Sequence, residues 1–186
     1  VKKYYNQNEK PRFITYQTGA QYTRGTTLEV GMAQLNASNE NEDIICAGPI
    51  YPMTDRGGHL DSNGYRWYGE ILGKVYYKTC ILGEEFKPLQ PIEITRNPKK
   101  SNEISIRFLV PKLPLVIDSR LVESQKNSGF VLYNNGIEQT LTGISIKDDC
   151  VILTSASPLT GNLEVSYATQ KTHGHGNLRD SDDYGA

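Results

Sequence analysis

The spacing of apolar residues changes at a segment bracketed by prolines, Lys87-Pro88-Leu89-Gln90-Pro91, and this change constrains the fold more than any other feature. Before the segment, strand-like and helix-like patterns alternate, and after it only short strand-like runs follow. Proline lacks an amide donor and fixes φ, so two prolines end a preceding helix and stiffen a short connector. A chain of 186 residues can hold two small domains. We therefore predict one domain at 1–88, a second at 89–170, and a polar tail rich in Gly and Asp at 171–186 that forms a surface loop or frayed end.

The first domain is predicted to contain a strand, a helix, a strand and a helix, in that order along the chain. Residues 12–18 are β-branched and aromatic, as in a strand, and residues 26–37 have the spacing of an amphipathic helix. Residues 44–51 are continuously apolar, as in a strand whose sheet is covered on both faces. A second helix follows over about 61–79. This order predicts a parallel sheet with right-handed crossovers.

The second helix can begin with Asp61 or Ser62 as its N-cap. An N-cap explains Asp61 better than a role as a catalytic acid does. Side chains at helical spacing predict the face that packs on the sheet, namely Tyr65, Tyr68, Leu72, Val75 and Tyr76. Trp67 falls off this stripe, so we expect it to be available to a ligand.

The second domain has the pattern of an antiparallel β-sandwich. Short runs, several of them alternating between apolar and polar residues, are separated by turn-forming residues such as Asn134-Asn135-Gly136 and Asp148-Asp149. This spacing is typical of two packed antiparallel sheets. The predicted strands lie at 92–94, 103–108, 129–132, 144–146, 150–153 and 163–167.

Composition excludes several classes of protein. The 20 Lys and Arg residues nearly balance 21 Asp and Glu residues, so the broad cationic surface of a nucleic-acid binder is not expected. No apolar run approaches the roughly 18 residues that a membrane span needs, and the first ten residues do not resemble a signal peptide. Cys46, Cys80 and Cys150 lie far apart and predict neither a disulfide framework nor a zinc site. We expect no metal and no organic cofactor.

The segment that contains the strongest candidates for catalytic residues is TDRGGHLDSNGYRWYGEILGKV at 54–75. It places Asp55 and His59 in one glycine-rich loop after a buried parallel strand, where open α/β sheets bind ligands. A carboxylate can hold an imidazole through Nδ1 and leave Nε2 to act as a general base. Gly57 and Gly58 would let the loop fold tightly enough for that contact.

The residues HLDSNGYRWYGE at 59–70 resemble the last conserved block of the SGNH (GDSL-type) hydrolases, in which an Asp and a His precede the final helix. The upstream residues PRFITYQ at 11–17 and MAQL at 32–35 are similar to the sialate O-acetylesterase and acetylxylan-esterase branch. The resemblance covers about the first 85 residues. It implies part of a flavodoxin-like three-layer α/β sandwich, and a serine esterase with His59 as general base and Asp55 as its partner.

Two departures from that family shape the expectation. Asp55 and His59 are separated by one residue more than in the usual Asp-x-x-His, so the pairing needs a bulged loop. The family's Gly-Asp-Ser nucleophile motif does not occur in this chain. We therefore expect the isolated chain to be inactive, and an N-terminal hydrolase segment or a partner chain to supply the serine.

The second domain resembles bacterial immunoglobulin-like modules, through ISIRFLVP at 104–111, GFVL at 129–132 and LTGNLEVSYA at 159–168. The tail residues GNLRDSD at 176–182 are similar to segments that end hydrolase-plus-sandwich proteins of bacteria and phages. The full expectation is an α/β hydrolase portion followed by an all-β immunoglobulin-like sandwich. These resemblances favour an extracellular, cell-surface or virion location but do not identify the compartment.

Three functional hypotheses remain open. The first is a carbohydrate O-acyl esterase in which Trp67, Tyr51 and Gln17 contact the acylated sugar, because aromatic faces pack on pyranose C–H surfaces. The second is a non-catalytic glycan-binding or structural component of a bacterial surface or phage tail assembly. The third is a metal-dependent hydrolase that uses His59 with tail residues, namely His173, His175, Asp180 and Asp182.

Overall fold

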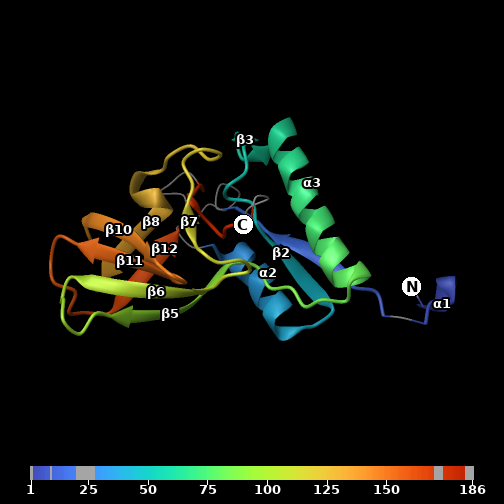
Figure 1. Ribbon diagram of the computed structural model, residues 1–186, viewed down its shortest axis with the longest axis horizontal. Coiled ribbons are helices and arrows are strands. Elements are labelled where there is room, and N and C mark those ends of the chain that lie inside the picture. The colour runs from blue at the N-terminus through green and yellow to red at the C-terminus, as the bar shows by residue number, and fades with distance from the viewer. Residues whose placement is uncertain (1, 9, 20–27, 170–173, 183–186) are drawn as a thin grey trace.

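A two-stranded parallel sheet forms the centre of the N-terminal half. The computed structural model describes residues 2–8, 10–19, 28–169 and 174–182. Strand β1 (Phe13–Gln17) pairs in parallel with β2 (Ile44–Pro49), and α2 (Glu29–Glu40) connects the two strands. Helix α3 (Ser62–Tyr76) covers the sheet face opposite α2 (Figure 1), and a π-helical segment, η2 (Tyr77–Ile81), continues it. A short helix, α1 (Lys2–Tyr5), extends away from the rest of the molecule.

The two faces of β2 explain why both helices pack against it. Ile45 and Ala47 alternate along the strand and join the core cluster of α3. Cys46 points the other way and is fully buried, and its amide donates to Ser38 Oγ of α2 over 3.0 Å. A continuously apolar strand is therefore required here, as the sequence predicts.

Helix α3 begins at the predicted cap and presents part of the predicted face to the core. Asp61 is the N-cap and accepts from the Gly64 amide over 2.8 Å, which confirms the expected capping role. Of the predicted stripe, Val75 is buried and Tyr68 and Leu72 pack against the core cluster, whereas Tyr65 and Tyr76 are exposed. Trp67 and Ile71, which the predicted stripe left out, are buried beside them. The prediction that Trp67 lies off the core-facing side is therefore wrong.

Two antiparallel sheets form the C-terminal half. The first has the order β10-β11-β6-β5 and the second the order β12-β8-β9. The strands are β5 (Gln90–Arg96), β6 (Glu103–Leu109), β8 (Phe130–Asn134), β9 (Ile137–Glu138), β10 (Leu141–Lys147), β11 (Cys150–Ser155) and β12 (Leu163–Tyr167), with a 3-10 turn, η3 (Lys126–Gly129), before β8. Their inward side chains form one apolar core that includes Ile104, Ile106, Phe130, Leu132, Val151 and Leu153.

The tail packs into the molecule. Strand β13 (Leu178–Arg179) pairs with β7 (Val116–Ile117), and Leu178 belongs to the core of the two antiparallel sheets. Asp180 is also buried. The expectation of a surface loop or frayed end is therefore wrong for residues 174–182, because one apolar side chain and its neighbouring hydrogen bonds anchor the segment. None of the helices in the described ranges is long and apolar enough to cross a membrane.

The expected fold class, a flavodoxin-like three-layer α/β portion followed by an all-β immunoglobulin-like sandwich, is wrong. The described residues form five sheets of two to four strands, contain more strand than helix, and show no flavodoxin-like arrangement. The alternation of strand and helix in the sequence supplies one parallel pair with one crossover helix, which is too little to define a doubly wound sheet. The domain boundaries at residues 88 and 170 stay a prediction.

Candidate functional site

Asp55 and His59 lie on a short hairpin between β2 and α3. Strand β3 (Asp55–Arg56) pairs with β4 (His59–Leu60), and Gly57 and Gly58 form the turn with φ of 64° and 92°. Positive φ at both central residues is the requirement of a tight hairpin turn, which explains the glycine pair. Glycine thus closes the loop as the sequence predicts.

The register of this hairpin decides which side chains share a face. Asp55 pairs with Leu60, and Arg56 pairs with His59. Cross-strand partners point to the same face, and successive residues point to opposite faces. Asp55 therefore turns inward with the buried Leu60, and His59 turns outward with Arg56 and is exposed. The structure brings the two residues to one hairpin but directs their side chains to opposite faces.

The carboxylate of Asp55 instead contacts a histidine of the tail. His175 Nε2 lies 2.9 Å from Asp55 Oδ2, and His175 Nδ1 lies 2.9 Å from the carbonyl oxygen of Tyr51. Both ring nitrogens thus face oxygen atoms, and the tautomer decides which of them donates. Asp55 Oδ1 also accepts from the Gly58 amide over 3.3 Å. In this arrangement neither nitrogen of His175 is available to act as a general base.

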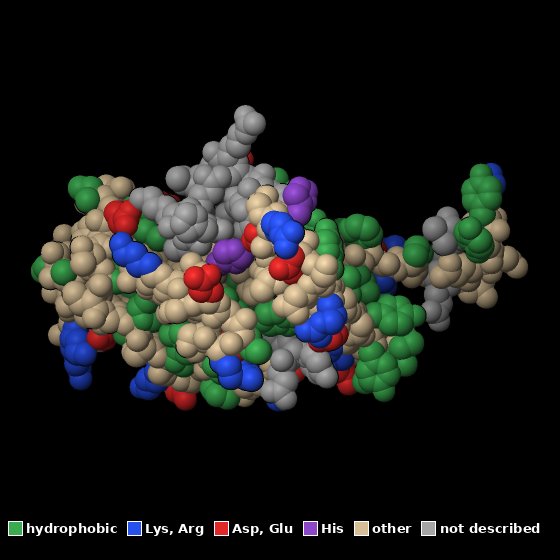
Figure 2. All heavy atoms as spheres, turned by 90° about the horizontal axis from the view of Figure 1, so that it is seen from above, with side chains coloured by type: hydrophobic (Ala, Val, Ile, Leu, Met, Phe, Trp, Pro, Cys, Tyr) green, Lys and Arg blue, Asp and Glu red, His purple; other side chains and the backbone are tan. Residues whose placement is uncertain are grey.

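A small pocket of about 170 Å³ lies beside the Asp55 and His175 pair. Its wall combines apolar side chains with a carboxylate and an amide, from Met53, Val122, Glu123 and Gln125. Figure 2 shows that both described histidine side chains reach the same face of the molecule, with charged side chains between them.

Hydrogen bonds fix the segment that carries His175. Tyr51 Oη donates to the Leu178 carbonyl over 2.5 Å, and the Leu178 amide donates to Tyr167 Oη over 2.7 Å. Arg179 Nε donates to Asp118 Oδ2 over 2.7 Å. The position of His175 is therefore determined from both sides, by the hairpin and by the strand pair β7 and β13.

Two buried carboxyl groups in this region have pKa values shifted in opposite directions. Burial raises the pKa of Asp118, but the amides of Leu121 and Arg120 and the Arg179 guanidinium outweigh burial, so the net pKa is below the ordinary value. For Asp180, burial dominates and raises the pKa, although the Asp182 amide and two cationic side chains act the other way.

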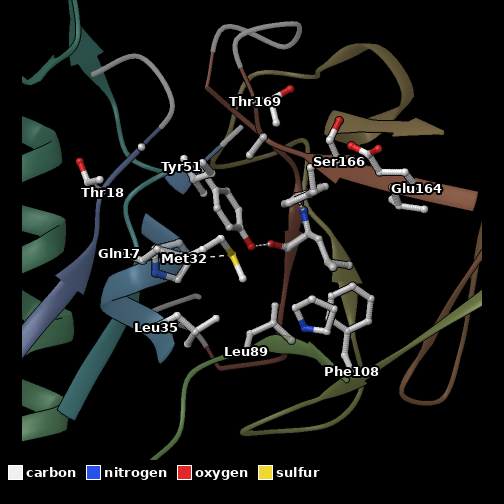
Figure 3. A pocket seen from close by; sticks show the side chains of 18 residues that line it. Gln17, Thr18, Met32, Leu35, Tyr51, Leu89, Phe108, Glu164, Ser166 and Thr169 are labelled. Atoms are coloured by element: carbon white, nitrogen blue, oxygen red, sulfur yellow. Dashed lines mark hydrogen bonds between the residues drawn. The ribbon is translucent and has the colours of Figure 1, made fainter. Parts of the chain in front are cut away.

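The three expected substrate-binding residues do not converge on one site. Gln17 and Tyr51 line a pocket of about 330 Å³ between α2 and β12, and Trp67 does not line it because its side chain lies on the buried face of α3, in the core cluster. Figure 3 shows the Tyr51 ring directed across this pocket and Gln17 beside Met32. The wall is mainly apolar, with Leu35, Leu89, Phe108 and Tyr167 among its residues.

The Tyr51 ring has partners inside the protein. It packs edge-on against Tyr167, with ring centroids 5.1 Å apart, and its hydroxyl is bound to the tail. Burial raises the pKa of the Tyr51 hydroxyl well above its ordinary value. Tyr51 therefore anchors the tail in this structure, and its role in binding sugar stays a prediction.

The residues expected of a metal site are spread out. Within the described residues, no group of three or more His, Cys, Asp or Glu side chains could hold an ion. His175 faces Asp55, and Asp182 Oδ2 lies 3.4 Å from Lys74 Nζ. His173 lies outside the described residues.

Sequence reasoning missed the contact between His175 and Asp55. The available signal was the presence of two histidines in a tail with an isolated Leu178, but nothing in the local pattern predicts which carboxylate such a histidine meets. Contacts between opposite ends of a chain leave no periodic trace in the sequence.

No family model matches the chain, and no curated protein matches it. In structure it is similar to XAC1771, a carbohydrate acetylesterase from Xanthomonas citri, with a TM-score of 0.68 and 14% sequence identity. The match covers 94% of this chain and 39% of the acetylesterase chain. The two proteins therefore share a hydrolase-like fold over nearly all of this chain, and the chain spans well under half of its neighbour's length.

Proposed function

We propose that this chain is part of a carbohydrate O-acyl esterase of the SGNH type, with His59 as the general base. The observation that carries the proposal is the fold shared with a carbohydrate acetylesterase over 94% of the chain. The position of His59 is compatible with the role, because its side chain is exposed on a hairpin that directly precedes the cap of α3. An exposed imidazole can meet a serine carried by another segment.

The proposed reaction is acyl transfer through a serine outside these 186 residues. His59 accepts the proton of the serine hydroxyl while its oxygen attacks the acyl carbonyl. The proton then passes to the departing sugar oxygen, and the C–O ester bond breaks to leave an acyl-enzyme. Water activated by the same imidazole releases the carboxylic acid and restores the serine. No metal or organic cofactor takes part in these steps.

Asp55 is the proposed partner of His59, and it can take this role only by exchanging His175 for His59. The hairpin has two residues in each strand, so few ladder hydrogen bonds oppose a change in its twist. Two glycines at its turn permit a wide range of backbone angles. Tyr51 and Gln17 are proposed to lie near the acylated sugar, and Trp67 is proposed to anchor α3 to the sheet through its buried side chain.

Hydrolysis of a chromogenic acetyl ester tests the proposal. The chain alone, the longest neighbouring gene product, and the two mixed are assayed, with His59→Ala as the control. We expect activity only with the longer or mixed protein, and a loss of at least about 100-fold in the variant. Full activity of the His59→Ala variant, or no activity in any sample, would refute the proposal that the protein is an esterase.

A second candidate is a glycan-binding or structural component without catalysis, at a cell surface or in a virion. One observation favours it, namely that the Asp55 carboxylate is engaged by His175 and turned away from the face of His59. Calorimetry with an acetylated oligosaccharide separates the two. Binding without release of acetate supports this candidate, and turnover supports the esterase.

A further inference from the structure

The pocket between α2 and β12 is large and apolar enough to hold a small molecule. Its volume of about 330 Å³ lies at the lower end of the range for small-molecule sites, roughly 300–1,000 Å³. Its apolar side chains come from both halves of the molecule, and Figure 3 shows several of them around the cavity. They include Met32, Leu35, Leu89, Phe108, Val165 and Leu178. We call this cavity the α2–β12 pocket.

The tyrosine hydroxyls in the wall of this pocket already have partners inside the protein. Tyr51 Oη donates to the Leu178 carbonyl over 2.5 Å, and Tyr167 Oη accepts from the Leu178 amide over 2.7 Å. A sugar carries many hydroxyls, and these paired groups could bind them only by giving up existing hydrogen bonds. This part of the wall therefore favours a hydrocarbon body over a sugar ring.

One polar side chain in the wall has spare hydrogen-bonding capacity. The Gln17 carboxamide meets Met32, with Nε2 3.7 Å from Sδ (Figure 3), and a thioether sulfur is a weak acceptor. Among the described residues this is the only hydrogen bond of the Gln17 side chain. A carboxamide offers two N–H donors and a carbonyl acceptor, so the oxygen and one N–H of Gln17 can meet a polar group of a ligand.

The charge at the pocket disfavours anions. Glu164 is exposed and is the only charged side chain among the described residues that line the pocket. An anionic ligand would therefore meet a carboxylate, with no Lys, Arg or His of the described lining to offset it. An uncharged ligand avoids this repulsion.

We propose that the α2–β12 pocket binds an uncharged small molecule with an aryl or alkyl body and one polar head group, which Gln17 holds. The proposal goes beyond the proposed esterase, because this ligand is not the acylated sugar and needs neither His59 nor a serine. Its body lies against Tyr51, Tyr167 and Leu178, whose hydrogen bonds fix the tail. Binding is therefore coupled to the docking of residues 174–182.

Two fluorescent probes with the same body test the selectivity for an uncharged ligand. N-phenyl-1-naphthylamine is uncharged, and 8-anilinonaphthalene-1-sulfonate adds one sulfonate to it. We expect saturable one-to-one binding of the uncharged probe to this chain, at least roughly tenfold tighter than binding of the sulfonate. Glu164→Gln should narrow the difference and leave the affinity for the uncharged probe unchanged. No saturable binding, or equal binding of the two probes to the wild type, would overturn the proposal.

Variants on α2 locate the bound probe. Met32→Glu places a carboxylate in the pocket wall, and Val30→Glu is the matched control because Val30 is 55% exposed on the same helix and does not line the pocket. We expect Met32→Glu to weaken binding of the uncharged probe at least roughly tenfold and Val30→Glu to leave it unchanged. Met32 is itself 42% exposed, so both variants should fold. Equal affinities of the two variants would contradict the proposal.

A variant of Gln17 tests the head group. Gln17→Met keeps the length of the side chain and removes its hydrogen-bonding groups, so it should weaken binding of the uncharged probe roughly 2- to 10-fold. An unchanged affinity would refute the role of Gln17 in holding the ligand.

Hydrogen exchange tests the coupling to the tail. The uncharged probe at about ten times its dissociation constant should slow exchange of the Leu178 amide roughly tenfold, because the tail must open for exchange and opening releases the probe. Unchanged exchange of this amide at saturation would refute the coupling.

Competition separates this pocket from the proposed chemistry. An acetylated oligosaccharide should not displace the uncharged probe. Displacement would assign the pocket to the sugar, which would overturn this proposal and support the proposed positions of Tyr51 and Gln17 in the esterase. Probe binding as expected, with no ester hydrolysis in the assay above, would retain the pocket and refute the esterase.

Discussion

His175 Nε2 lies 2.9 Å from Asp55 Oδ2, and the two residues come from different halves of the chain. The second ring nitrogen of His175 faces the Tyr51 carbonyl, so one imidazole joins the tail to the strand end that precedes the hairpin. The contact has a structural consequence, because it fixes residues 174–182 to the N-terminal half. It has a functional one as well, because it occupies the carboxylate proposed to serve His59.

His175→Ala should destabilise the fold by about 1–3 kcal/mol, because it removes two hydrogen bonds and leaves the half-buried Asp55 carboxylate without this partner. His59→Ala is the matched control, and its exposed position predicts a change within about 0.5 kcal/mol. Urea unfolding monitored by circular dichroism measures both. Equal midpoints for wild type and His175→Ala would show that the contact contributes nothing to stability.

Leu178→Ala should be more damaging, by about 2–5 kcal/mol, because the Leu178 side chain is fully buried in the core of the two antiparallel sheets. Leu113→Ala removes the same number of atoms from a side chain that is 58% exposed, and should be nearly silent. Thermal unfolding of the two variants compares them. A small effect of Leu178→Ala would mean that the tail is not part of the folded core.

Asp118 and Asp180 should respond to acid in opposite ways. The folded-state pKa of Asp118 is lowered, so its stabilising contribution is present above the ordinary pKa and is lost as the pH falls through the folded value. Asp118→Asn should therefore destabilise the protein at neutral pH and lose its effect under strongly acidic conditions. Unfolding midpoints of the wild type and of Asp118→Asn, measured from pH 7 downward, show whether the difference in stability between them disappears.

Asp180 has the opposite sign because burial raises its pKa. Its charged form is disfavoured in the fold, so stability rises as the pH falls through the folded value toward the ordinary one. Asp180→Asn should accordingly stabilise the protein at neutral pH, since asparagine keeps an acceptor for the Asp182 amide. Unfolding midpoints of the Asp180→Asn variant over the same pH range test this expectation. Destabilisation by Asp180→Asn at pH 7 would contradict a raised pKa for Asp180.

Tyr68→Phe should leave the protein as stable or more stable. The Tyr68 hydroxyl is buried and has no hydrogen-bond partner among the residues that the structure describes. Its removal therefore relieves part of a desolvation cost of about 1–3 kcal/mol. Tyr167→Phe is the informative contrast, because Tyr167 Oη accepts from the Leu178 amide and its loss leaves that donor unpaired. The urea midpoint should stay the same or rise for Tyr68→Phe and should fall for Tyr167→Phe.

Local structure was predictable where local rules act alone. The buried strand at Ile44–Pro49, the Asp61 cap and the glycine turn each follow from a short stretch of sequence. The face of α3 was predictable only in part, because helical spacing located Tyr68, Leu72 and Val75 but not the buried Trp67 and Ile71 beside them. Element order predicted the parallel pairing that β1 and β2 show, whereas the flavodoxin-like three-layer arrangement was inferred from a family resemblance and is wrong.

The site was also predictable only in part, because side-chain direction and contacts between distant segments are not determined by a short stretch of sequence. The sequence placed Asp55 and His59 in one loop, but a change of one position in hairpin register turns a side chain to the other face. Here Asp55 pairs with Leu60 and Arg56 pairs with His59, so Asp55 and His59 are not cross-strand partners. The imidazole that meets Asp55 comes from a segment whose composition indicated a surface tail, and only Leu178 marks it as buried.

Asp55→Asn and His175→Gln should separate the two possible partners of the Asp55 carboxylate in the active, assembled esterase. If Asp55 holds His59 during turnover, Asp55→Asn should reduce kcat by roughly 10²–10⁴-fold, because the amide disturbs the tautomer of the base. His175→Gln should leave kcat unchanged or raise it, because it releases the carboxylate from a competing partner. Steady-state hydrolysis of an acetyl ester measures both, with unfolding midpoints to account for folded fraction. A loss in His175→Gln as large as that in Asp55→Asn, at equal stability, would mean that the tail histidine and not His59 is the residue that Asp55 serves.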